Sequence, residues 1–176
     1  MEKLKIGGLK QSLELCQFDL KGRNSSEKIV SRVTKLLASH KINIDFLTCN
    51  PNSTRYHQFT FCVSQDKVFD TSKLLKAKGV LPTGWEMDCR EHVGILTVFP
   101  HQSALNIVGA IMIAWATHSI PMYGLSTSLS AVSFVTDYRL IEKSVEVIQD
   151  SFLLPENRSP LKPELRYYQS DTVKGR

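Results

Sequence analysis

The chain has 176 residues, of which 42% are hydrophobic and 22% are charged, a composition typical of a soluble globular protein. Its longest apolar stretch, residues 104–116, contains Asn106 and is shorter than the roughly 20 residues needed to cross a bilayer. No membrane span is therefore expected. Residues 1–5 include an acidic side chain and lack a long apolar core and a small-residue cleavage site, which predicts no secretory signal and a cytoplasmic location.

The formal net charge of +5 does not by itself predict nucleic-acid binding. The basic residues are scattered beside acidic ones rather than clustered in one run, and part of the excess lies in residues 158–176. A solvated surface and a basic tail are the interpretation that we favour.

The sequence contains no recognisable metal, cofactor or catalytic motif. Its four cysteines are widely spaced, with no C-x-x-C pair and no histidine at zinc-finger spacing, so we expect reduced, mostly buried thiols. His101 and His118 are isolated from other ligands and are expected at the surface, whereas Trp85 and Trp115 lie on apolar stripes and are expected in the core. The cysteines are Cys16, Cys49, Cys62 and Cys89.

The first half of the chain has the pattern β-α-β-β-α-β. Asn24, with Glu27 three residues later, is typical of a helix start. Alternation of Ile42, Ile44 and Phe46 with polar residues predicts a strand. The predicted elements are a strand at 12–19, a helix at 24–40, strands at 42–47 and 59–63, a helix at 68–79 and a strand at 85–89.

The second half starts the same pattern again. The predicted elements are a strand at 93–97, a helix at 103–118, strands at 122–129 and 131–136, and a helix at 141–152. Residues 41–47 and 119–125 align as an internal repeat of roughly 80 residues, which is the size of a domain. The sequence therefore predicts an α+β protein with two tandem ferredoxin-like βαββαβ domains.

The second unit lacks its fourth strand, because residues 155–160 after the last helix are typical of a loop. Either residues 4–9 or residues 164–168 are available to cover the open edge, and we favour the N-terminal segment. The predicted domains are residues 12–91 for the first, residues 3–10 with 92–154 for the second, and residues 155–176 as a tail.

Three segments resemble the regulatory region of aspartate kinases. Residues 124–135, GLSTSLSAVSFV, are similar to the MISTSExxISFVV segment of the second ACT domain of these enzymes. Residues 41–47, KINIDFL, resemble the GINIDMI strand of their first ACT domain, and residues 4–15 resemble their entry segment. The resemblance spans residues 3–155 and implies the tandem ACT domains of the C-terminal regulatory region without the kinase domain. In that family the entry segment supplies the missing strand of the second domain.

The resemblance implies regulation rather than catalysis, because no segment resembles the kinase domain, its nucleotide loops or its substrate-binding residues. In aspartate kinases these domains pair between subunits and bind lysine or threonine at the interface. We therefore expect a homodimer formed by ACT–ACT sheet pairing, an amino-acid effector and a separate biosynthetic enzyme as partner. Nucleic acid and membrane are not expected partners, and no cofactor is expected.

The loop after the first predicted strand is the candidate effector site of the first domain. Free amides at the helix start, at Ser25 and Ser26, offer donors for a carboxylate, and Gly22 permits a close backbone approach. The resemblance matches Asp45 to an aspartate of the family, which makes it the candidate to balance an ammonium group. The alternative is that these residues only cap the helix or face solvent. The candidates are Asp19, Lys21, Gly22, Asn24, Ser25, Ser26, Asn43, Ile44, Asp45, Asn50 and Gln58.

The second domain departs further from the family, and its site is expected to be altered. Pro121 stands where the family has an asparagine that helps hold the ligand, and the loop at residues 99–103 has no glycine. The serines near residue 126 serve equally well as cross-strand pairs. The candidates in this domain are His101, Gln102, Ser103, Pro121, Ser126, Thr127 and Ser128.

Two other functions are alternatives to amino-acid sensing. One is an interaction module for protein or nucleic acid, acting in gene regulation, that has the ACT fold and no ligand. The other is an independent enzyme, for which the sequence offers no set of catalytic residues.

Overall fold

The structure, a computed structural model, describes residues 3–23, 27–50, 57–77, 79–99, 104–154 and 161–163. Its helices are α1 (Glu27–Ser39), η1 (Gln65–Lys67), α2 (Val68–Lys76), α3 (Ala104–Thr117), η2 (Tyr138–Leu140) and α4 (Ile141–Ser151). Its strands are β1 (Leu4–Lys5), β2 (Gly8–Gln11), β3 (Leu15–Gly22), β4 (Phe46–Asn50), β5 (His57–Ser64), β6 (Glu86–Phe99), β7 (Gly124–Thr127), β8 (Val132–Asp137), β9 (Phe152–Leu153) and β10 (Leu161–Pro163).

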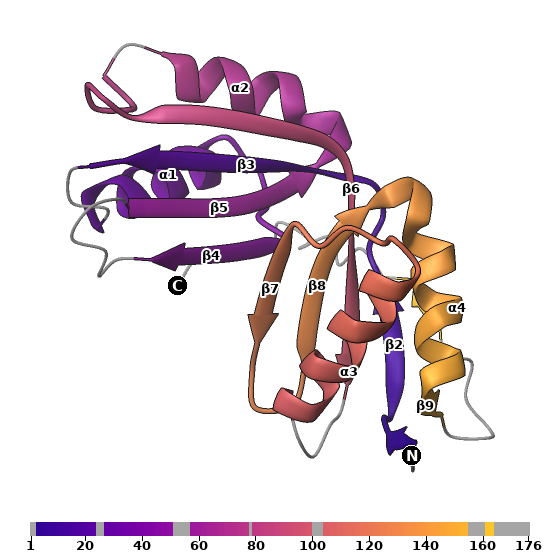
Figure 1. The fold of residues 1–176 in the computed structure, drawn as a ribbon. Helices are drawn as coiled ribbons and strands as arrows, with labels where there is room; N and C mark the ends of the chain where they lie inside the picture. Colours follow the sequence, from indigo (N-terminus) through magenta and orange to yellow (C-terminus); the bar gives the residue numbers. More distant parts are fainter. Residues whose placement is uncertain are drawn as a thin grey trace, which may run out of the picture.

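Strand β6 belongs to both halves of the molecule. The sequence predicted two strands here, at 85–89 and 93–97, whereas the structure has one strand of 14 residues. Its first half pairs with β3, and its second half pairs with β2 and β8. In Figure 1, β6 runs along the first sheet and then turns into the second, whose strands cross the direction of the first.

Each half has the antiparallel strand order of a ferredoxin-like βαββαβ domain. The order is β6-β3-β5-β4 in the first sheet and β2-β6-β8-β7 in the second. The predicted fold class is therefore confirmed, including the N-terminal strand that completes the second sheet. Strand β10 pairs in parallel with the outer edge of β2, so a C-terminal segment also adds to this sheet. The predicted alternative, residues 164–168, lies outside the described residues.

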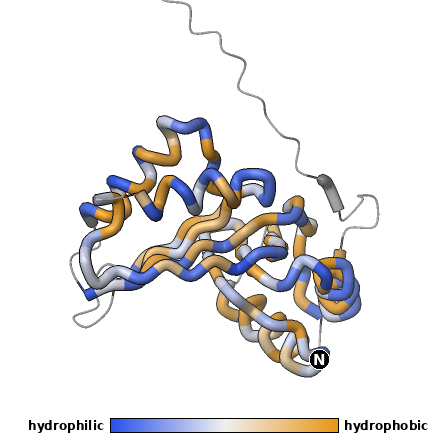
Figure 2. The backbone as a smooth tube through the Cα atoms, turned by 90° about the horizontal axis from the view of Figure 1, so that it is seen from above, coloured by the Kyte–Doolittle hydropathy of each residue, from blue (hydrophilic) through white to orange (hydrophobic). Residues whose placement is uncertain are grey.

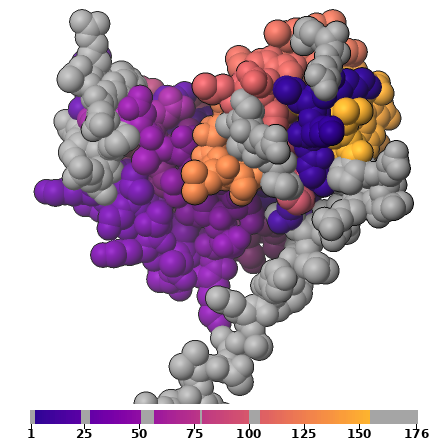
Figure 3. All heavy atoms as spheres, turned by 90° about the horizontal axis from the view of Figure 1, so that it is seen from below, coloured from indigo at the N-terminus to yellow at the C-terminus, as the bar shows by residue number. Residues whose placement is uncertain are grey.

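The N-terminal segment is joined to the second domain at a further point. Strand β1 pairs in parallel with β9, and the amide of Ile6 donates to the carbonyl of Leu153 at 3.0 Å. In Figure 3 the N-terminal residues, in indigo, lie between the residues of α3, in salmon, and those of α4, in yellow. The chain therefore begins as part of the second domain, crosses to the first along the edge of β6, and returns.

The predicted internal repeat appears as the same turn after α1 and after α3. Lys41 and Ser119 both have φ of 55°, in the left-handed region. In the next residue of each copy, the amide of Ile42 donates to Leu37 at 2.9 Å and that of Ile120 donates to Trp115 at 2.8 Å. This pattern satisfies the last carbonyls of a helix and buries the following apolar side chain.

The strand predicted at 42–47 is wrong over its first four residues, since β4 begins at Phe46. Ile42 is buried and Ile44 half-buried because the segment that leaves α1 packs over the first core. Their period-two spacing comes from that packing and not from a sheet register. The strand predicted at 12–19 likewise begins later, at Leu15, and Leu13 is 47% exposed.

Each sheet is covered by two helices on one face only. Helices α1 and α2 enclose a first core with Phe18, Phe59 and Phe61, and α3 and α4 enclose a second core. Figure 2 shows the alternation of hydrophilic and hydrophobic residues along the helices that such one-sided covering requires. Trp85 and Trp115 are in these cores, as predicted. None of the described helices has the length and apolarity that a membrane crossing would need.

The prediction of mostly buried cysteines is correct for only half of them. Cys16 and Cys62 are buried, whereas Cys49 and Cys89 are exposed. Cys49 lies on β4, which is an edge strand of the first sheet, and Cys89 lies in the half of β6 that forms the other edge. Side chains at sheet edges have fewer neighbours to cover them, which the spacing of cysteines along the chain does not reveal.

Replacing Leu9 of β2 by alanine is expected to destabilise the protein by about 2–5 kcal/mol. Leu9 is 0% exposed and packs in the second core, so its truncation leaves a cavity. Denaturant unfolding measures the change, and Leu13→Ala, at a site 47% exposed, is the matched control with a loss below about 0.5 kcal/mol. Equal small losses for both variants would contradict the integration of β2 into this domain.

Candidate functional site

The two sheets meet through their helix-free faces. Six buried side chains form a separate small core at this junction, and Tyr123 packs against it. Across the junction the guanidinium of Arg90 lies 4.1 Å from the centre of the Tyr123 ring. The six are Leu15, Phe46, Cys62, Val93, Ile95 and Val135.

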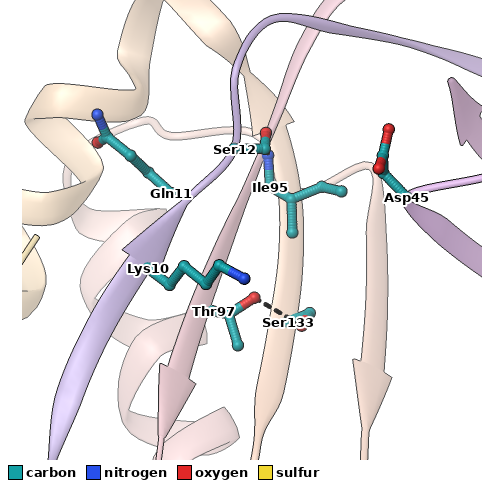
Figure 4. A pocket seen from close by; sticks show the side chains of 7 residues that line it. All are labelled: Lys10, Gln11, Ser12, Asp45, Ile95, Thr97 and Ser133. Atoms are coloured by element: carbon teal, nitrogen blue, oxygen red, sulfur yellow. Dashed lines mark hydrogen bonds between the residues drawn. The ribbon is translucent and has the colours of Figure 1, made fainter. Parts of the chain in front are cut away.

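A polar cavity of about 60 Å3 opens beside this junction core. Figure 4 shows the ammonium of Lys10 near Thr97 and Ser133, with Asp45 on the opposite side and the Gln11 amide directed away. Lys10 comes from β2, whereas Asp45 immediately precedes β4 in the first domain. The cavity is lined by Lys10, Gln11, Ser12, Asp45, Ile95, Thr97 and Ser133.

Hydrogen bonds hold the walls of this cavity in place. The hydroxyls of Thr97 and Ser133 lie 2.8 Å apart across neighbouring strands. Ser12 accepts a hydrogen bond from the amide of Ile95 at 2.9 Å, and this ties the segment between β2 and β3 to β6. A cavity with one cationic and one anionic side chain and several hydroxyls suits a small ligand that carries both charges.

The predicted residues Asn43 and Asp45 lie next to each other at the entry to β4. The side-chain amide of Asn43 donates to the Asp45 carboxylate at 2.8 Å, and the Asp45 backbone amide donates to the carbonyl of Cys62 at 3.0 Å. These bonds fix the position of the carboxylate at the cavity. Ile44, between them, packs against the first core and does not line the cavity.

The predicted residues Asp19 and Gln58 meet in a different place, on the helix-free face of the first sheet. The Asp19 carboxylate accepts from Gln17 at 2.9 Å, from Gln58 at 3.2 Å and from Thr60 at 2.5 Å. Gln17 and Thr60 are buried, with exposures of 2% and 3%. Asp19 therefore serves as the acceptor for two buried polar side chains, a role in folding that the sequence did not suggest.

Lys21 and Gly22 lie at the end of β3, where each has a neighbour within the chain. Lys21 pairs with the exposed Asp88 at 3.4 Å. A Cβ atom at Gly22 would lie 2.5 Å from the ring of Trp85, so the glycine makes room for a tryptophan on that face. Asn50 is exposed at the end of β4 and pairs in register with Gln58.

The structure separates Asp45 from Gly22. Gly22 is opposite His57 on β5, whereas Asp45 bonds to Cys62, five residues further along that strand. At ~3.4 Å per residue this is about 17 Å. The two charged groups of an amino acid are attached to one carbon, so within one chain Asp45 does not reach a ligand bound beside Gly22.

The predicted residues of the second domain are spread along its edge. The Pro121 carbonyl accepts from Thr136 at 2.7 Å, Ser126 is opposite Ser133 in the register of β7 and β8, and Thr127 is exposed. Ser128 closes the turn between these strands by accepting from the amide of Ala131 at 3.0 Å. Asn24, Ser25, Ser26, His101, Gln102 and Ser103 lie outside the described residues.

The sequence made Asp45 a candidate, and Asp45 lines this cavity, but the sequence did not suggest the residues opposite it. Lys10, Thr97 and Ser133 lie on three strands that become neighbours only when β2 pairs with β6. Thr97 and Ser133 are each a polar position between buried apolar ones in their strands, which marks the face without helices, whereas Lys10 follows the buried Leu9 but precedes the polar Gln11. In the described part of the chain, no group of His, Cys, Asp and Glu side chains is arranged to hold a metal ion.

Several solved structures with the same fold are aspartate kinases or their separate regulatory subunits. The regulatory subunit of aspartate kinase from Thermus thermophilus matches with a TM-score of 0.73 and 18% identity, over 84% of this chain and 99% of that chain. The chain has the fold of tandem ACT domains. Aspartokinase III of E. coli, solved in complex with lysine and aspartate, matches with a TM-score of 0.61 and 13% identity, over 86% of this chain and 34% of that chain.

A third match is the aspartate kinase of Clostridium acetobutylicum, with a TM-score of 0.71 and 9% identity, over 87% of this chain and 36% of that chain. No protein-family model matches the sequence, and no curated protein matches it. The tandem ACT chain thus corresponds to nearly the whole of a separate regulatory subunit and to about a third of a complete kinase.

Replacing Asp19 by alanine is expected to destabilise the protein by about 1–3 kcal/mol, because Gln17 and Thr60 lose their acceptor inside the structure. Denaturant unfolding measures the loss. Asp88→Ala is the control, since its ion pair with Lys21 is exposed and contributes at most about 1 kcal/mol. A loss for Asp19→Ala no greater than for the control would contradict its role in this network.

Proposed function

We propose that this protein is a regulatory protein, without catalytic activity of its own, that binds a small ligand, an amino acid, where its two ACT domains meet and controls a partner enzyme. The observation that carries the proposal is the match along 99% of a separate aspartate kinase regulatory subunit. A related fold in E. coli aspartokinase III was solved with lysine and aspartate bound, which supports an effector of the lysine or threonine type.

The junction cavity is the position that we assign to the amino acid. Lys10 and the hydroxyls of Thr97 and Ser133 suit its carboxylate, and Asp45 suits its ammonium group. The cavity of about 60 Å3 holds the charged head of the ligand and leaves its side chain at the opening. Recognition of the head group would then be stronger than discrimination between side chains.

A ligand at this position would act on the arrangement of the two domains. The cationic wall belongs to β2 in the second sheet, whereas Asp45 belongs to the first domain. An amino acid that contacts both walls binds more tightly to the arrangement in which they are close, and it therefore shifts the population toward that arrangement. A partner enzyme that contacts both domains would respond to this shift.

The other polar candidates of the first domain are proposed for a second, separate effector contact. They are Asp19, Lys21, Gly22, Asn24, Ser25, Ser26, Asn50 and Gln58. The candidates His101, Gln102, Ser103, Pro121, Ser126, Thr127 and Ser128 are proposed for the corresponding contact of the second domain. We also propose residues 12–91 as the first ACT domain, and residues 3–10 with 92–154 as the second.

A homodimer is proposed through helix α3 and strand β7, which is an edge strand in the described sheet. Along α3, Leu105, Met112 and Ile113 are 85%, 50% and 71% exposed, and they form one face with the exposed Gly109 and Ala116. This face has no charge. The equivalent helix α1 exposes the basic residues Lys28, Arg32 and Lys35, so the apolar face of a second copy is the better match for α3.

Saturating concentrations of the cognate amino acid are expected to raise the melting temperature by roughly 5–10 °C. A thermal-shift screen of the twenty amino acids at millimolar concentration tests this. Asp45→Asn, which keeps an acceptor for Asn43 but removes the charge, should weaken binding at least ~10-fold. Asp88→Asn, at an exposed site away from the cavity, is the control with unchanged binding.

A screen in which no amino acid stabilises the protein would contradict the sensing function. Binding to nucleic acid that persists at physiological salt in a gel-shift assay would then favour the alternative of an interaction module without ligand. Binding that is lost at that salt concentration would reflect only the net charge of +5.

Ile113→Glu is expected to weaken dimerisation at least ~30-fold, since a carboxylate replaces an apolar side chain in the interface. Light scattering coupled to size-exclusion chromatography, over a range of concentrations, measures the change. Ser31→Glu, on the exposed polar face of α1, is the control and should leave the dimer intact. A dimer unaffected by Ile113→Glu would place the contact elsewhere.

A further inference from the structure

Two thiols of the first domain meet across neighbouring strands. Cys16 on β3 and Cys89 on β6 are 73 residues apart in sequence, and their sulfur atoms lie 2.9 Å apart. Both are free cysteines. A disulfide has its sulfurs at about 2.05 Å, so the pair needs to close by only about 0.9 Å.

The local strand geometry explains this contact. Cys89 is opposite Phe18 in the register of β3 and β6, and Cys16 is two residues before Phe18, so all three side chains are on the helix-covered face. The register between these strands shifts between Leu15 and Gln17. Cys16 lies at this irregularity. An extra residue in one strand changes the distance between side chains that are diagonal neighbours on adjacent strands, as Cys16 and Cys89 are.

The two thiols are unequal in access and in electrostatics. Cys16 is 0% exposed in the first core, whereas Cys89 is exposed at the edge of the sheet. Burial raises the pKa of both thiols above the ordinary value. At Cys89 the hydrogen bond from Cys16 and the charge of Lys76 partly oppose that rise in pKa. Cys89 is therefore the thiol that a reagent reaches first, and Cys16 is the thiol held beside it.

We propose that Cys16 and Cys89 form a thiol–disulfide modification site that is oxidised by a low-molecular-weight disulfide such as oxidised glutathione. The Cys89 thiolate attacks one sulfur of the reagent, forming a mixed disulfide and releasing one glutathione thiolate, which takes up a proton. Cys16 then loses its proton to solvent and attacks the Cys89 sulfur, releasing the second glutathione. Two protein thiols are oxidised to one disulfide, and the reagent is reduced to two thiols.

The link would join β3 to the strand that both domains share. It would close a loop between residues that are 73 positions apart, which restricts the unfolded chain. The oxidised protein is expected to melt roughly 10 °C higher than the reduced protein. This inference is independent of the proposed effector site, because neither cysteine lines the junction cavity.

The test is to treat the full chain with oxidised glutathione, block the remaining thiols with an alkylating reagent and map the cysteines by mass spectrometry. Cys49 is the internal control. It is exposed, and it lies three residues after Phe46, which is opposite Cys62, so Cys49 and Cys62 are on opposite faces of the sheet. Cys49 is expected to keep a glutathione adduct, whereas Cys16 and Cys89 are expected in one cross-linked peptide pair that has lost two hydrogen atoms.

Two variants complete the experiment. Cys89→Ser, a change at an exposed position, should abolish the cross-link and the rise in melting temperature, and Cys49→Ser should leave both intact. A stable glutathione adduct on Cys89 with Cys16 still alkylatable after unfolding would overturn the proposal. A disulfide between the Cys89 residues of two chains would overturn it as well.

Discussion

The hydrogen-bonded strand β6 is the element on which the rest of the structure depends. It is the edge strand of the first sheet and an interior strand of the second. Strands β2 and β3 both pair antiparallel with it, so the chain passes along β6 from the second domain to the first. Buried Leu96 and Val98 hold its second half in one core, while Cys89 is opposite the buried Phe18 in its first half. Because β6 turns from one sheet into the other and is paired in both halves, this one strand couples the positions of the two sheets.

The junction cavity is a consequence of this arrangement. Helices cover only one face of each sheet, so the two uncovered faces meet where β6 passes from one sheet to the other. Apolar residues fill the centre of the junction, and polar side chains remain around it. A ligand that contacts Lys10 and Asp45 contacts both domains at once, which is the physical requirement for coupling binding to a change in domain arrangement.

Local patterns misled the sequence analysis where packing, and not the sheet, determined which side chains are buried. Ile42 and Ile44 alternate like strand residues, but they follow the left-handed turn at Lys41 and cover the end of a core. In β6, the exposed residues 86 and 88–92 interrupt the apolar pattern because this half of the strand is a sheet edge. The same edge exposes Cys89, which the spacing of the cysteines does not indicate.

The sequence by itself determined the two domains, their order of elements and the N-terminal strand of the second, because hydrophobic periodicity and the repeated segments act locally or within one domain. It also made Asp45 a candidate, and Asp45 lines the junction cavity. Only the tertiary structure decided that β6 is a single strand, that Asp45 lies about 17 Å along the sheet from Gly22, and that Lys10 faces Asp45 across the cavity. These facts depend on strand pairing between distant parts of the chain, and register between such strands is fixed by the packing of both cores together.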